Sequence, residues 1–292
     1  MTVRLIINAD DFGLTPGINR AIGELHDAGA VTSTTLMATG LAFDDAVTLA
    51  HARPSLGVGC HIVLVDGVPV SDPVTIPTLL GPDRRTFRNS LADFALGVLR
   101  GAIRQDEIQR EALAQVQKLQ RAGLTLTHVD THKHTHLLSR VTRPILRALE
   151  QAGIRSIRNP FEPRWAASLS GGTGRSLLVR ALEPGRRRFE ASPSIASHRI
   201  LTTRGSIGIS ATGQLNSTTL AALLKSIPKG TWEIVCHPGY NDPDLDAITT
   251  RLRTEREIEL RALLAAFTKS LPRSSNPSGL QLIHYGNLIP LK

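Results

Sequence analysis

Short apolar runs alternate along the chain with longer segments in which hydrophobic residues recur every three or four positions. A short apolar run bounded by turn residues is typical of a buried strand, and the longer spacing is typical of an amphipathic helix. The runs that indicate strands cover residues 3–8, 34–37, 57–64, 124–130, 154–158, 207–210, 232–236 and 279–283. The segments that indicate helices cover residues 42–51, 91–99, 106–122, 143–151, 176–182, 218–226 and 248–267. This alternation predicts a parallel sheet with crossover helices.

Local signals mark the first helix and the longest loop. Thr15 is expected to cap a helix that starts at Pro16 and is closed by Gly29. Between Asp66 and Asp83 the chain is rich in Pro, Gly and Asp, which predicts a long loop near the functional site.

This number of strands in 292 residues favours a closed barrel over an open sheet. We therefore predict an α/β fold, a distorted TIM-like (β/α) barrel of parallel strands, as a single domain over residues 1–292. Apart from the short helical run at 176–182, residues 164–205 show no clear pattern and are expected to form an insertion or lid. Within them, 170–174 should be a flexible linker and the arginine-rich 186–189 a solvated loop, and 272–278 is expected to be another linker.

Chemically reactive side chains occur at or near the ends of these strands. Asp10 and Asp11 follow the first run, His61 lies in the third, Arg158 ends the fifth, and His237 follows 232–236. The carboxyl ends of parallel strands meet at one edge, where ligands and catalytic groups collect. A closed sheet would therefore bring these residues together.

The densest polar stretch, residues 128–136, has a polar side chain at every second position. These are His128, Asp130, His132, His134 and His136. If the stretch leaves a strand in extended conformation, all five start on one side. Such a group is costly to bury unless it binds something, and a divalent cation accepts nitrogen and oxygen ligands of this kind. The alternative is a polar strand end on a wet surface.

Plain structural explanations stay open for the other residues. Asp10 and Asp11 could form a turn that caps the following helix. His61 could be a hydrogen-bonded core histidine, and Arg158 could be a surface arginine before a proline turn. Their convergence on one edge is what favours a shared site.

If these residues converge, their chemistry is that of a metal-dependent hydrolase. One Asp and two His leave room for a water molecule, which the metal acidifies, or for a carbonyl oxygen, which it polarises. A free Asp would take the proton and a His on the opposite side would protonate the leaving group. Two alternatives remain: hydrolysis of another bond such as a phosphoester, with two metals about 3.5–4 Å apart, and carbohydrate binding without turnover.

Composition narrows the range of partners. The formal charge of +9 could favour nucleic acid, an anionic membrane or acidic ligands. Aromatic residues make up only 4% and no nucleic-acid module is recognisable, so a solvated basic surface is favoured. Two cysteines give no disulfide framework, and no apolar run reaches the roughly 18 residues of a membrane span. The chain starts with a strand pattern, not a signal peptide, so we expect a cytoplasmic protein. Contact with the inner membrane face and a homodimer stay open.

Three motifs in combination resemble a known family. They are residues 8–13 (NADDFG), the His-x-Asp-x-His-x-His pattern that starts at His128, and residues 236–239 (CHPG). Together they are similar to the YdjC/ChbG carbohydrate deacetylases over nearly the full chain. Residues 61–70 (HIVLVDGVPV) and 158–163 (RNPFEP) resemble the branch associated with hopanoid biosynthesis, often called HpnK. Residues 137–140 (LLSR) depart from that branch, where another His and a Pro are expected.

The resemblance implies a distorted TIM-like barrel that removes N-acetyl groups from amino sugars with one divalent metal ion, Mg²⁺ or Zn²⁺. The residues that would bind the metal are Asp11, His61 and His132. For the hopanoid branch the implied substrate is an N-acetylglucosaminyl hopanoid, a glycolipid, in place of a chitooligosaccharide.

The resemblance also implies roles for the remaining residues. Asp10 would be the general base, and His237 the general acid or oxyanion partner. Arg158 would orient Asp10 or the substrate. The residues expected to contact substrate or to orient the metal ligands are Asp130, His134 and His136.

Overall fold

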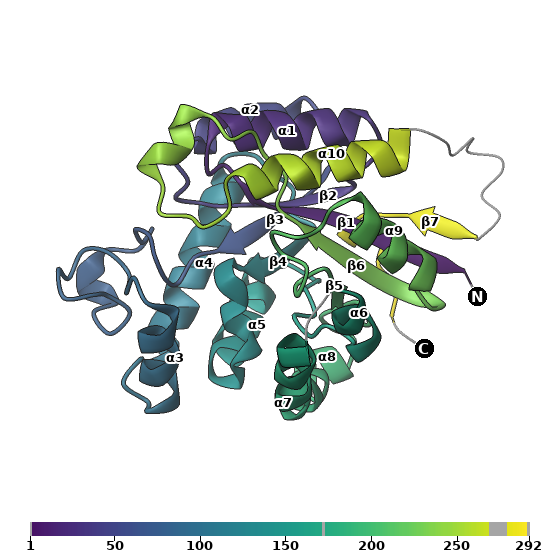
Figure 1. The fold of residues 1–292 in the computed structure, drawn as a ribbon. Helices are drawn as coiled ribbons and strands as arrows, with labels where there is room; N and C mark the ends of the chain where they lie inside the picture. Colours follow the sequence, from purple (N-terminus) through teal and green to yellow (C-terminus); the bar gives the residue numbers. More distant parts are fainter. Residues whose placement is uncertain (1, 171–172, 269–278, 291–292) are drawn as a thin grey trace.

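The computed structural model describes residues 2–170, 173–268 and 279–290. In these ranges seven strands form one sheet with helices on both sides (Figure 1). The strands are β1 (Val3–Phe12), β2 (Ser33–Leu36), β3 (Gly57–Ile62), β4 (His128–Thr131), β5 (Ser206–Ile207), β6 (Gly230–Cys236) and β7 (Leu280–Leu282). Their order is β4-β3-β2-β1-β6-β5, every pair is parallel, and β7 pairs with the start of β1.

The two ends of this sheet curl toward each other. Next to β4, Ile157 bridges to Val129, and Ser156 bridges to Leu201. Leu201 lies shortly before β5, which pairs with β6. The bridges therefore link the two ends of the strand order and confirm the predicted barrel-like α/β sheet. The strand expected at 154–158 is wrong in extent, because this segment makes only isolated bridges.

Ten helices accompany the sheet in the described part of the chain. They are α1 (Pro16–Asp27), α2 (Phe43–His51), α3 (Leu91–Leu99), α4 (Gln105–Arg121), α5 (Ser139–Ala152), α6 (Arg164–Leu169), α7 (Thr173–Glu190), α8 (Pro193–Ala196), α9 (Ser217–Ser226) and α10 (Thr254–Thr268). Short 3₁₀ turns occur at η1 (Pro73–Thr75), η2 (His132–Leu137), η3 (Pro243–Ala247) and η4 (Tyr285–Asn287). The Thr15 hydroxyl accepts the N–H of Ile18, which confirms the predicted cap of α1.

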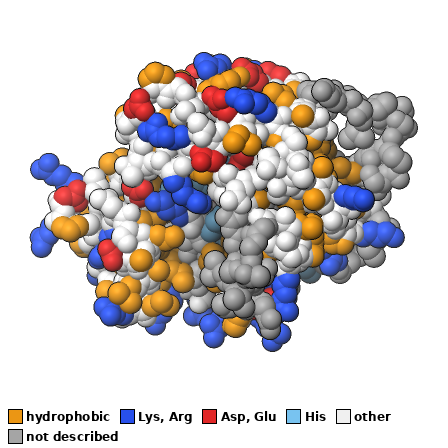
Figure 2. Space-filling view, viewed as in Figure 1, with side chains coloured by type: hydrophobic (Ala, Val, Ile, Leu, Met, Phe, Trp, Pro, Cys, Tyr) orange, Lys and Arg blue, Asp and Glu red, His pale blue; other side chains and the backbone are white. Residues whose placement is uncertain are grey.

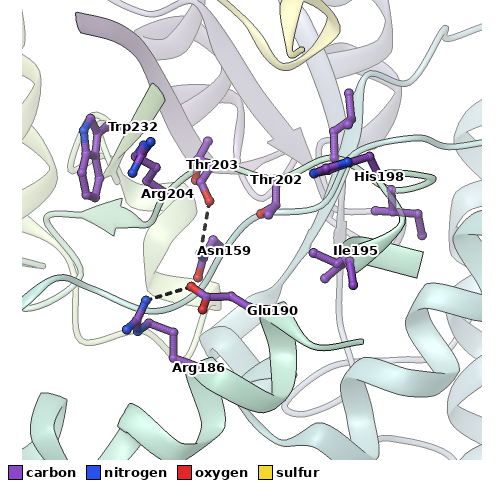
Figure 3. Close-up of a pocket in the computed structure, with 12 residues that line it drawn as sticks. Asn159, Arg186, Glu190, Ile195, His198, Thr202, Thr203, Arg204 and Trp232 are labelled. Carbon is purple, nitrogen blue, oxygen red and sulfur yellow. Dashed lines mark hydrogen bonds and ion pairs between the residues drawn. The ribbon is translucent and has the colours of Figure 1, made fainter. Parts of the chain in front are cut away.

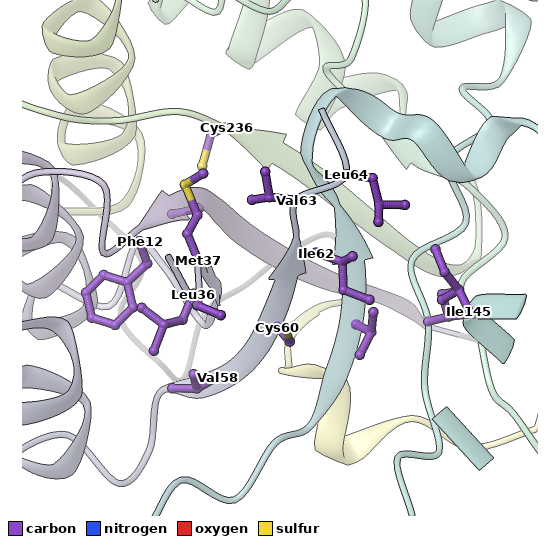
Figure 4. Packing of buried hydrophobic residues seen from close by; sticks show 14 of the residues in the cluster. Phe12, Leu36, Met37, Val58, Cys60, Ile62, Val63, Leu64, Ile145 and Cys236 are labelled. Atoms are coloured by element: carbon purple, nitrogen blue, oxygen red, sulfur yellow. The ribbon is translucent and has the colours of Figure 1, made fainter. Parts of the chain in front are cut away.

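The main core lies between the sheet and its helices. Both faces of the parallel sheet are covered, so Leu5, Ile6 and Ile7 are all fully buried although they are consecutive. Figure 4 shows part of this core, with Phe12 and Leu36 near one end and Ile145 at the other.

A smaller apolar cluster lies on the other face of β1. It consists of Ile6, Ile283, Tyr285 and Leu288, so the last described segment packs against the start of β1. Ile6 shares its strand face with Asn8 and Asp10, because side chains alternate along a strand. The polar site therefore rests on an apolar base.

The histidine-rich stretch differs from the sequence prediction. β4 ends at Thr131, and η2 follows with Lys133 at φ 53° and His134 at φ 51°. Two successive residues in the left-handed region break the extended conformation, so strand alternation ends at Thr131. The prediction that all five polar residues of 128–136 start on one side is therefore wrong beyond β4.

The segment expected to be an insertion or lid contains α6, α7 and α8. The solvated loop predicted at 186–189 is wrong, because these residues belong to α7. Arg186 donates to Glu183 and Glu190, pairs at i,i−3 and i,i+4 that stabilise a helix. Of the linker predicted at 170–174, residues 171–172 lie outside the described residues, and so does all of 272–278.

The start of α10 also differs from the prediction. α10 begins at Thr254, not at residue 248, because η3 and an irregular stretch precede it. In the described ranges, no helix combines the length and apolarity that a membrane crossing requires.

Candidate functional site

A bulge at the end of β1 directs two adjacent carboxylates to one place. The pairing of β1 with β2 shifts register between Ala9 and Phe12, and Asp11 has φ 65°. In a regular strand neighbouring side chains point to opposite faces, and an extra residue in left-handed conformation changes that direction. As a result Asp10 and Asp11 each bring a carboxylate oxygen near a ring nitrogen of His61.

Arg158 holds Asp10 through a two-pronged ion pair. Its Nη1 donates to Asp10 Oδ2 at 2.7 Å and its Nη2 to Oδ1 at 2.6 Å. The same guanidinium pairs with Asp130 and with Glu233, whose Oε1 accepts from Nε at 2.9 Å. Arg158 is fully buried, so the surface arginine considered above is excluded. One buried guanidinium therefore forms ion pairs with three carboxylates.

The pKa values of Asp10 and Glu233, two of the carboxylates around Arg158, shift in opposite directions. Burial raises the pKa of Asp10, but Arg158, with His61 and His237, lowers it well below its usual range overall. Burial raises the pKa of Glu233, and Arg158 offsets that only in part. Of Asp10 and Glu233, Asp10 is therefore the carboxylate that is held firmly in its ionised form.

Asp11, His61 and His132 form a cluster that fits a divalent metal ion. Asp11 Oδ1 lies 3.6 Å from His61 Nε2 and 3.5 Å from His132 Nδ1, and the two ring nitrogens are 3.3 Å apart. One atom from each residue lies within 4.8 Å of the others. Two imidazole nitrogens and one carboxylate oxygen are a common donor set for such ions.

The surroundings of His61 favour a cation at this point. Its Nδ1 donates to Asp130 Oδ1 at 2.7 Å, the contact by which a carboxylate orients a metal-binding histidine. Burial lowers the pKa of His61, but Asp130, Asp10 and Asp11 raise it to about 9 overall. The carboxylates thus attract positive charge, whether a proton or a metal ion. Asp10, His61 and Asp130 also lie close enough for a metal, but Arg158 already pairs with both of these carboxylates.

His237, at the end of β6, faces Asp10. Its Nε2 lies 3.8 Å from Asp10 Oδ2, and its backbone N–H donates to Glu259 Oε2 at 2.6 Å. The buried Nδ1 has no hydrogen-bond partner among the described residues. The imidazole thus presents its Nε2 to the ionised carboxylate of Asp10.

The other histidines of the 128–136 stretch do not belong to the cluster of Asp11, His61 and His132. His128 stacks on Tyr285, with ring centroids 3.8 Å apart, and belongs to the base of the site. His136 is buried, with Nδ1 2.5 Å from Thr131 Oγ1 and Nε2 3.3 Å from the carbonyl oxygen of Arg158. Burial and the positive charge of Arg158 lower the pKa of His134 to about 3, and its Nδ1 has no partner in the described ranges.

Four residues of this site escape sequence reasoning. They are Glu233, Arg256, Glu259 and Tyr285. Glu233 gives a usable signal, since a glutamate inside an apolar strand requires a buried partner. Arg256 and Glu259 give none, because they look like ordinary charges on the helix α10.

A cavity of about 380 Å³ lies away from this cluster (Figure 3). It is lined by α7, α8 and the segment before β5, with Glu190, His198 and Trp232 among its side chains. Of its lining residues, Asn159 is the direct neighbour of Arg158, but none of the predicted site residues lines it. On the face in Figure 2, histidine surface is instead visible near the centre, beside Lys and Arg atoms.

Comparison with solved structures identifies the same fold elsewhere. An Enterococcus faecalis protein, described in connection with cellobiose-phosphate cleavage, superposes with a TM-score of 0.78 over 98% of both chains. The two sequences are 22% identical, so this likeness shows the fold alone.

Comparison of sequences shows the family. The chain is 32% identical over 281 residues to a carbohydrate deacetylase of Geobacillus stearothermophilus, with 96% of each chain covered. It is 27% identical to a carbohydrate deacetylase of Thermoanaerobacter pseudethanolicus, over 89% of this chain and 90% of the relative. A match to the carbohydrate deacetylase of Brevibacillus brevis is 41% identical but covers 54% of this chain and 60% of the relative. Residues 4–271 match the family model described as YdjC-like protein, and the chain therefore belongs to that family.

Proposed function

We propose that this chain is a carbohydrate deacetylase, a hydrolase that uses one divalent metal ion to remove an N-acetyl group from an amino sugar. The observation that carries the proposal is the donor cluster of Asp11, His61 and His132 directly beside the Asp10–His237 pair. Family membership and the relatives named carbohydrate deacetylase support it.

The metal would be held by Asp11 Oδ1, His61 Nε2 and His132 Nδ1. A divalent ion bound there would polarise the amide carbonyl and acidify a water molecule. Two imidazoles favour Zn²⁺ and the carboxylate also suits Mg²⁺, so both ions are candidates. Asp130 would keep the His61 ring oriented through its bond to Nδ1.

Asp10 would accept a proton from the attacking water. Arg158 keeps this carboxylate ionised, so it is available as a base at neutral pH. Its low pKa also makes it a weak base that releases the proton readily. His237, whose Nε2 lies 3.8 Å from Asp10 Oδ2, would protonate the leaving nitrogen. Overall the water oxygen bonds to the carbonyl carbon, the C–N bond breaks, and acetate and an amine leave.

Arg158 would act by positioning and not by contact with substrate. It has no exposed surface, and its donors point to Asp10, Asp130 and Glu233. The sequence-based alternative in which Arg158 orients the substrate is therefore disfavoured. His134 and His136 would contact substrate or support the ligands.

The proposal includes two candidate substrates, which differ in the group attached to the amino sugar. A chitooligosaccharide-like substrate and an N-acetylglucosaminyl hopanoid are both carried forward from the sequence resemblance. A glycolipid substrate would be consistent with a cytoplasmic protein that touches the inner membrane face. A lid role for 164–205 and a homodimer belong to the same proposal.

Two alternatives make different predictions. A two-metal phosphoesterase needs a second vacant donor group, and the group of Asp10, His61 and Asp130 is already paired with Arg158. A non-catalytic carbohydrate-binding protein needs no ionised carboxylate beside a histidine. Both features favour the one-metal hydrolase.

The test is acetate release from a substrate panel. Metal-reconstituted protein would be offered N-acetylglucosamine, chitobiose, an N-acetylglucosaminyl lipid mimic and a phosphoester, each with and without chelator. Chelator-sensitive acetate release supports the proposal, and the preferred sugar selects the substrate class. Phosphate release without acetate, or sugar binding without turnover, would select one of the alternatives.

A further inference from the structure

Helix α10 supplies two buried charged residues to the site. Arg256 and Glu259 are each 1% exposed, whereas Arg261 on the same helix has an exposed side chain. Positions i and i+3 lie on one face of a helix. This face meets the ends of β1 and β6, so one helical turn reaches both halves of the proposed active site.

Arg256 holds one oxygen of Asp11. Its Nη2 donates to Asp11 Oδ2 at 2.6 Å, and its Nε donates to the carbonyl oxygen of Leu252 at 3.2 Å, which fixes the guanidinium. The other oxygen of Asp11, Oδ1, is the one that faces His61 and His132. Arg256 thus determines which oxygen is left for the metal.

Glu259 holds the backbone of His237. Its Oε2 accepts the N–H of His237 at 2.6 Å, and its Oε1 accepts the N–H of Gly213 at 3.1 Å. Both carboxylate oxygens are therefore used on the main chain. The imidazole of His237 stays free to face Asp10.

The turn after β6 packs tightly on this part of α10. The Gly239 N–H donates to the carbonyl oxygen of Arg256 at 3.3 Å. A Cβ at Gly239 would lie 2.9 Å from Ile18 Cγ1 and 3.1 Å from Arg256 Cδ, closer than ordinary van der Waals contact. A glycine is thus needed for the turn to lie this close to Arg256.

We infer that the Arg256–Glu259 turn of α10 is a positioning unit, in which Arg256 sets the metal-binding orientation of Asp11 and Glu259 sets the location of His237. The inference rests on the proposed function, since it assigns the two residues to its metal site and its general acid. It divides their effects: Arg256 should act on metal affinity, and Glu259 on turnover.

The test of Arg256 is a calorimetric Zn²⁺ titration of the chelator-stripped full chain, without substrate. Arg256→Met should weaken Zn²⁺ binding about 10–100-fold, the usual effect of losing a group that orients a metal ligand. Arg261→Met makes the same change on the exposed face of α10 and should leave the Kd as in the wild type. Arg256→Lys keeps the positive charge but loses the planar guanidinium with its several N–H donors, and should also weaken Zn²⁺ binding.

Wild-type Zn²⁺ affinity in folded Arg256→Met would overturn the role of Arg256. If that variant does not fold, wild-type affinity in Arg256→Lys would overturn it. A wild-type chain that binds no Zn²⁺ would overturn the metal site itself, which distinguishes failure of the proposed function from failure of this inference.

The test of Glu259 separates kcat from KM. Glu259→Gln keeps the side-chain shape and one acceptor oxygen. Its NH₂ group, a donor, would face the backbone N–H of either His237 or Gly213, so one of these two hydrogen bonds is lost. It should leave the Zn²⁺ Kd as in the wild type and lower kcat about 10-fold or more, with KM little changed. Glu257→Gln, on a half-exposed position of α10, is the matched control. An unchanged kcat, or a loss of Zn²⁺ affinity equal to that of Arg256→Met, would overturn the division of roles.

Discussion

Arg158 binds both carboxylate oxygens of Asp10, at 2.7 and 2.6 Å, across 148 positions of the chain. The same buried guanidinium pairs with Asp130 and Glu233. Burial lowers the pKa of His61, but two of these carboxylates, Asp130 and Asp10, together with Asp11 raise it overall, so the surroundings of His61 favour positive charge. The proposed metal-binding cluster and the proposed general base are thus linked through shared buried charges.

Removal of Arg158 should destabilise the fold. Arg158→Met leaves Asp10 and Asp130 buried without their cation, and breaking such a pair costs about 3–5 kcal/mol. Urea unfolding of the metal-free protein measures the free energy of unfolding. Arg147→Met, an exposed position on α5, is the control and should change it by no more than about 0.5 kcal/mol. Equal stability of the two variants would show that the ion pairs of Arg158 do not stabilise the fold.

The adjacent acids should be separable by mutation. Asp11→Asn should weaken Zn²⁺ binding about 10-fold or more, because it removes a charged ligand oxygen. Asp10→Asn should retain metal binding and lose turnover by about 100-fold or more, because an amide cannot accept the proton. Calorimetric titration and an acetate assay on the same samples check both. Loss of metal binding in Asp10→Asn alone would reverse the assignment.

The stability of the metal-free protein should fall between neutral and alkaline pH. The pKa of His61 is raised to about 9 in the fold, from an ordinary value of 6.5. A raised pKa means that protonation stabilises the fold: the contribution is complete below pH 6.5 and is lost as the pH rises through 9. This contribution of His61 to the free energy of unfolding is roughly 3 kcal/mol. Thermal unfolding at pH 6.5, 8 and 9.5 in chelator measures it, and His61→Gln should flatten the dependence. A wild-type profile as flat as that of the variant would be inconsistent with the charge network.

Asp10 should give the opposite dependence on the acid side. Its pKa is lowered in the fold by Arg158 against the effect of burial, so its ionised form stabilises the protein. This contribution is present above the unfolded-state pKa, near 3.8, and is lost as the pH falls below it. Asp10→Asn should therefore reduce the loss of stability between pH 5 and pH 2, roughly, in acid titrations followed by circular dichroism.

His132, and not His134, should be the third metal ligand. His132 Nδ1 lies 3.5 Å from Asp11 Oδ1, whereas His134 follows in the left-handed turn and is not part of the cluster. His132→Asn should weaken Zn²⁺ binding about 10-fold or more, and His134→Asn should retain it and instead raise KM. The reverse pattern in the titration would make His134 the ligand.

The sequence predicted the parts of the site that depend on strand order. Asp10, Asp11, His61 and His237 come together because parallel strands end at one edge, and periodicity is enough to predict that. The capping of α1 by Thr15 follows equally from local chemistry.

Sequence reasoning failed where backbone conformation or distant contacts decide. The left-handed Lys133 and His134 end the alternation of the histidine-rich stretch, and this conformation is uncommon for both residue types, although less so for His than for Lys. The contact of Arg256 with Asp11 spans 245 positions, so a pattern confined to α10 could not reveal it. The short bridges at Ser156 and Ile157 replace a predicted strand because sheet closure, not propensity, sets their length.

Metal-dependent deacetylation is tested most directly by acetate release measured together with bound metal on one preparation. Wild-type protein with one divalent ion per chain should release acetate from an N-acetyl amino sugar, lose the activity on chelation and regain it when metal is restored. Asp10→Asn with the same metal content should release none. Equal acetate release by chelated and metal-loaded wild-type protein, or by Asp10→Asn, would contradict the claim.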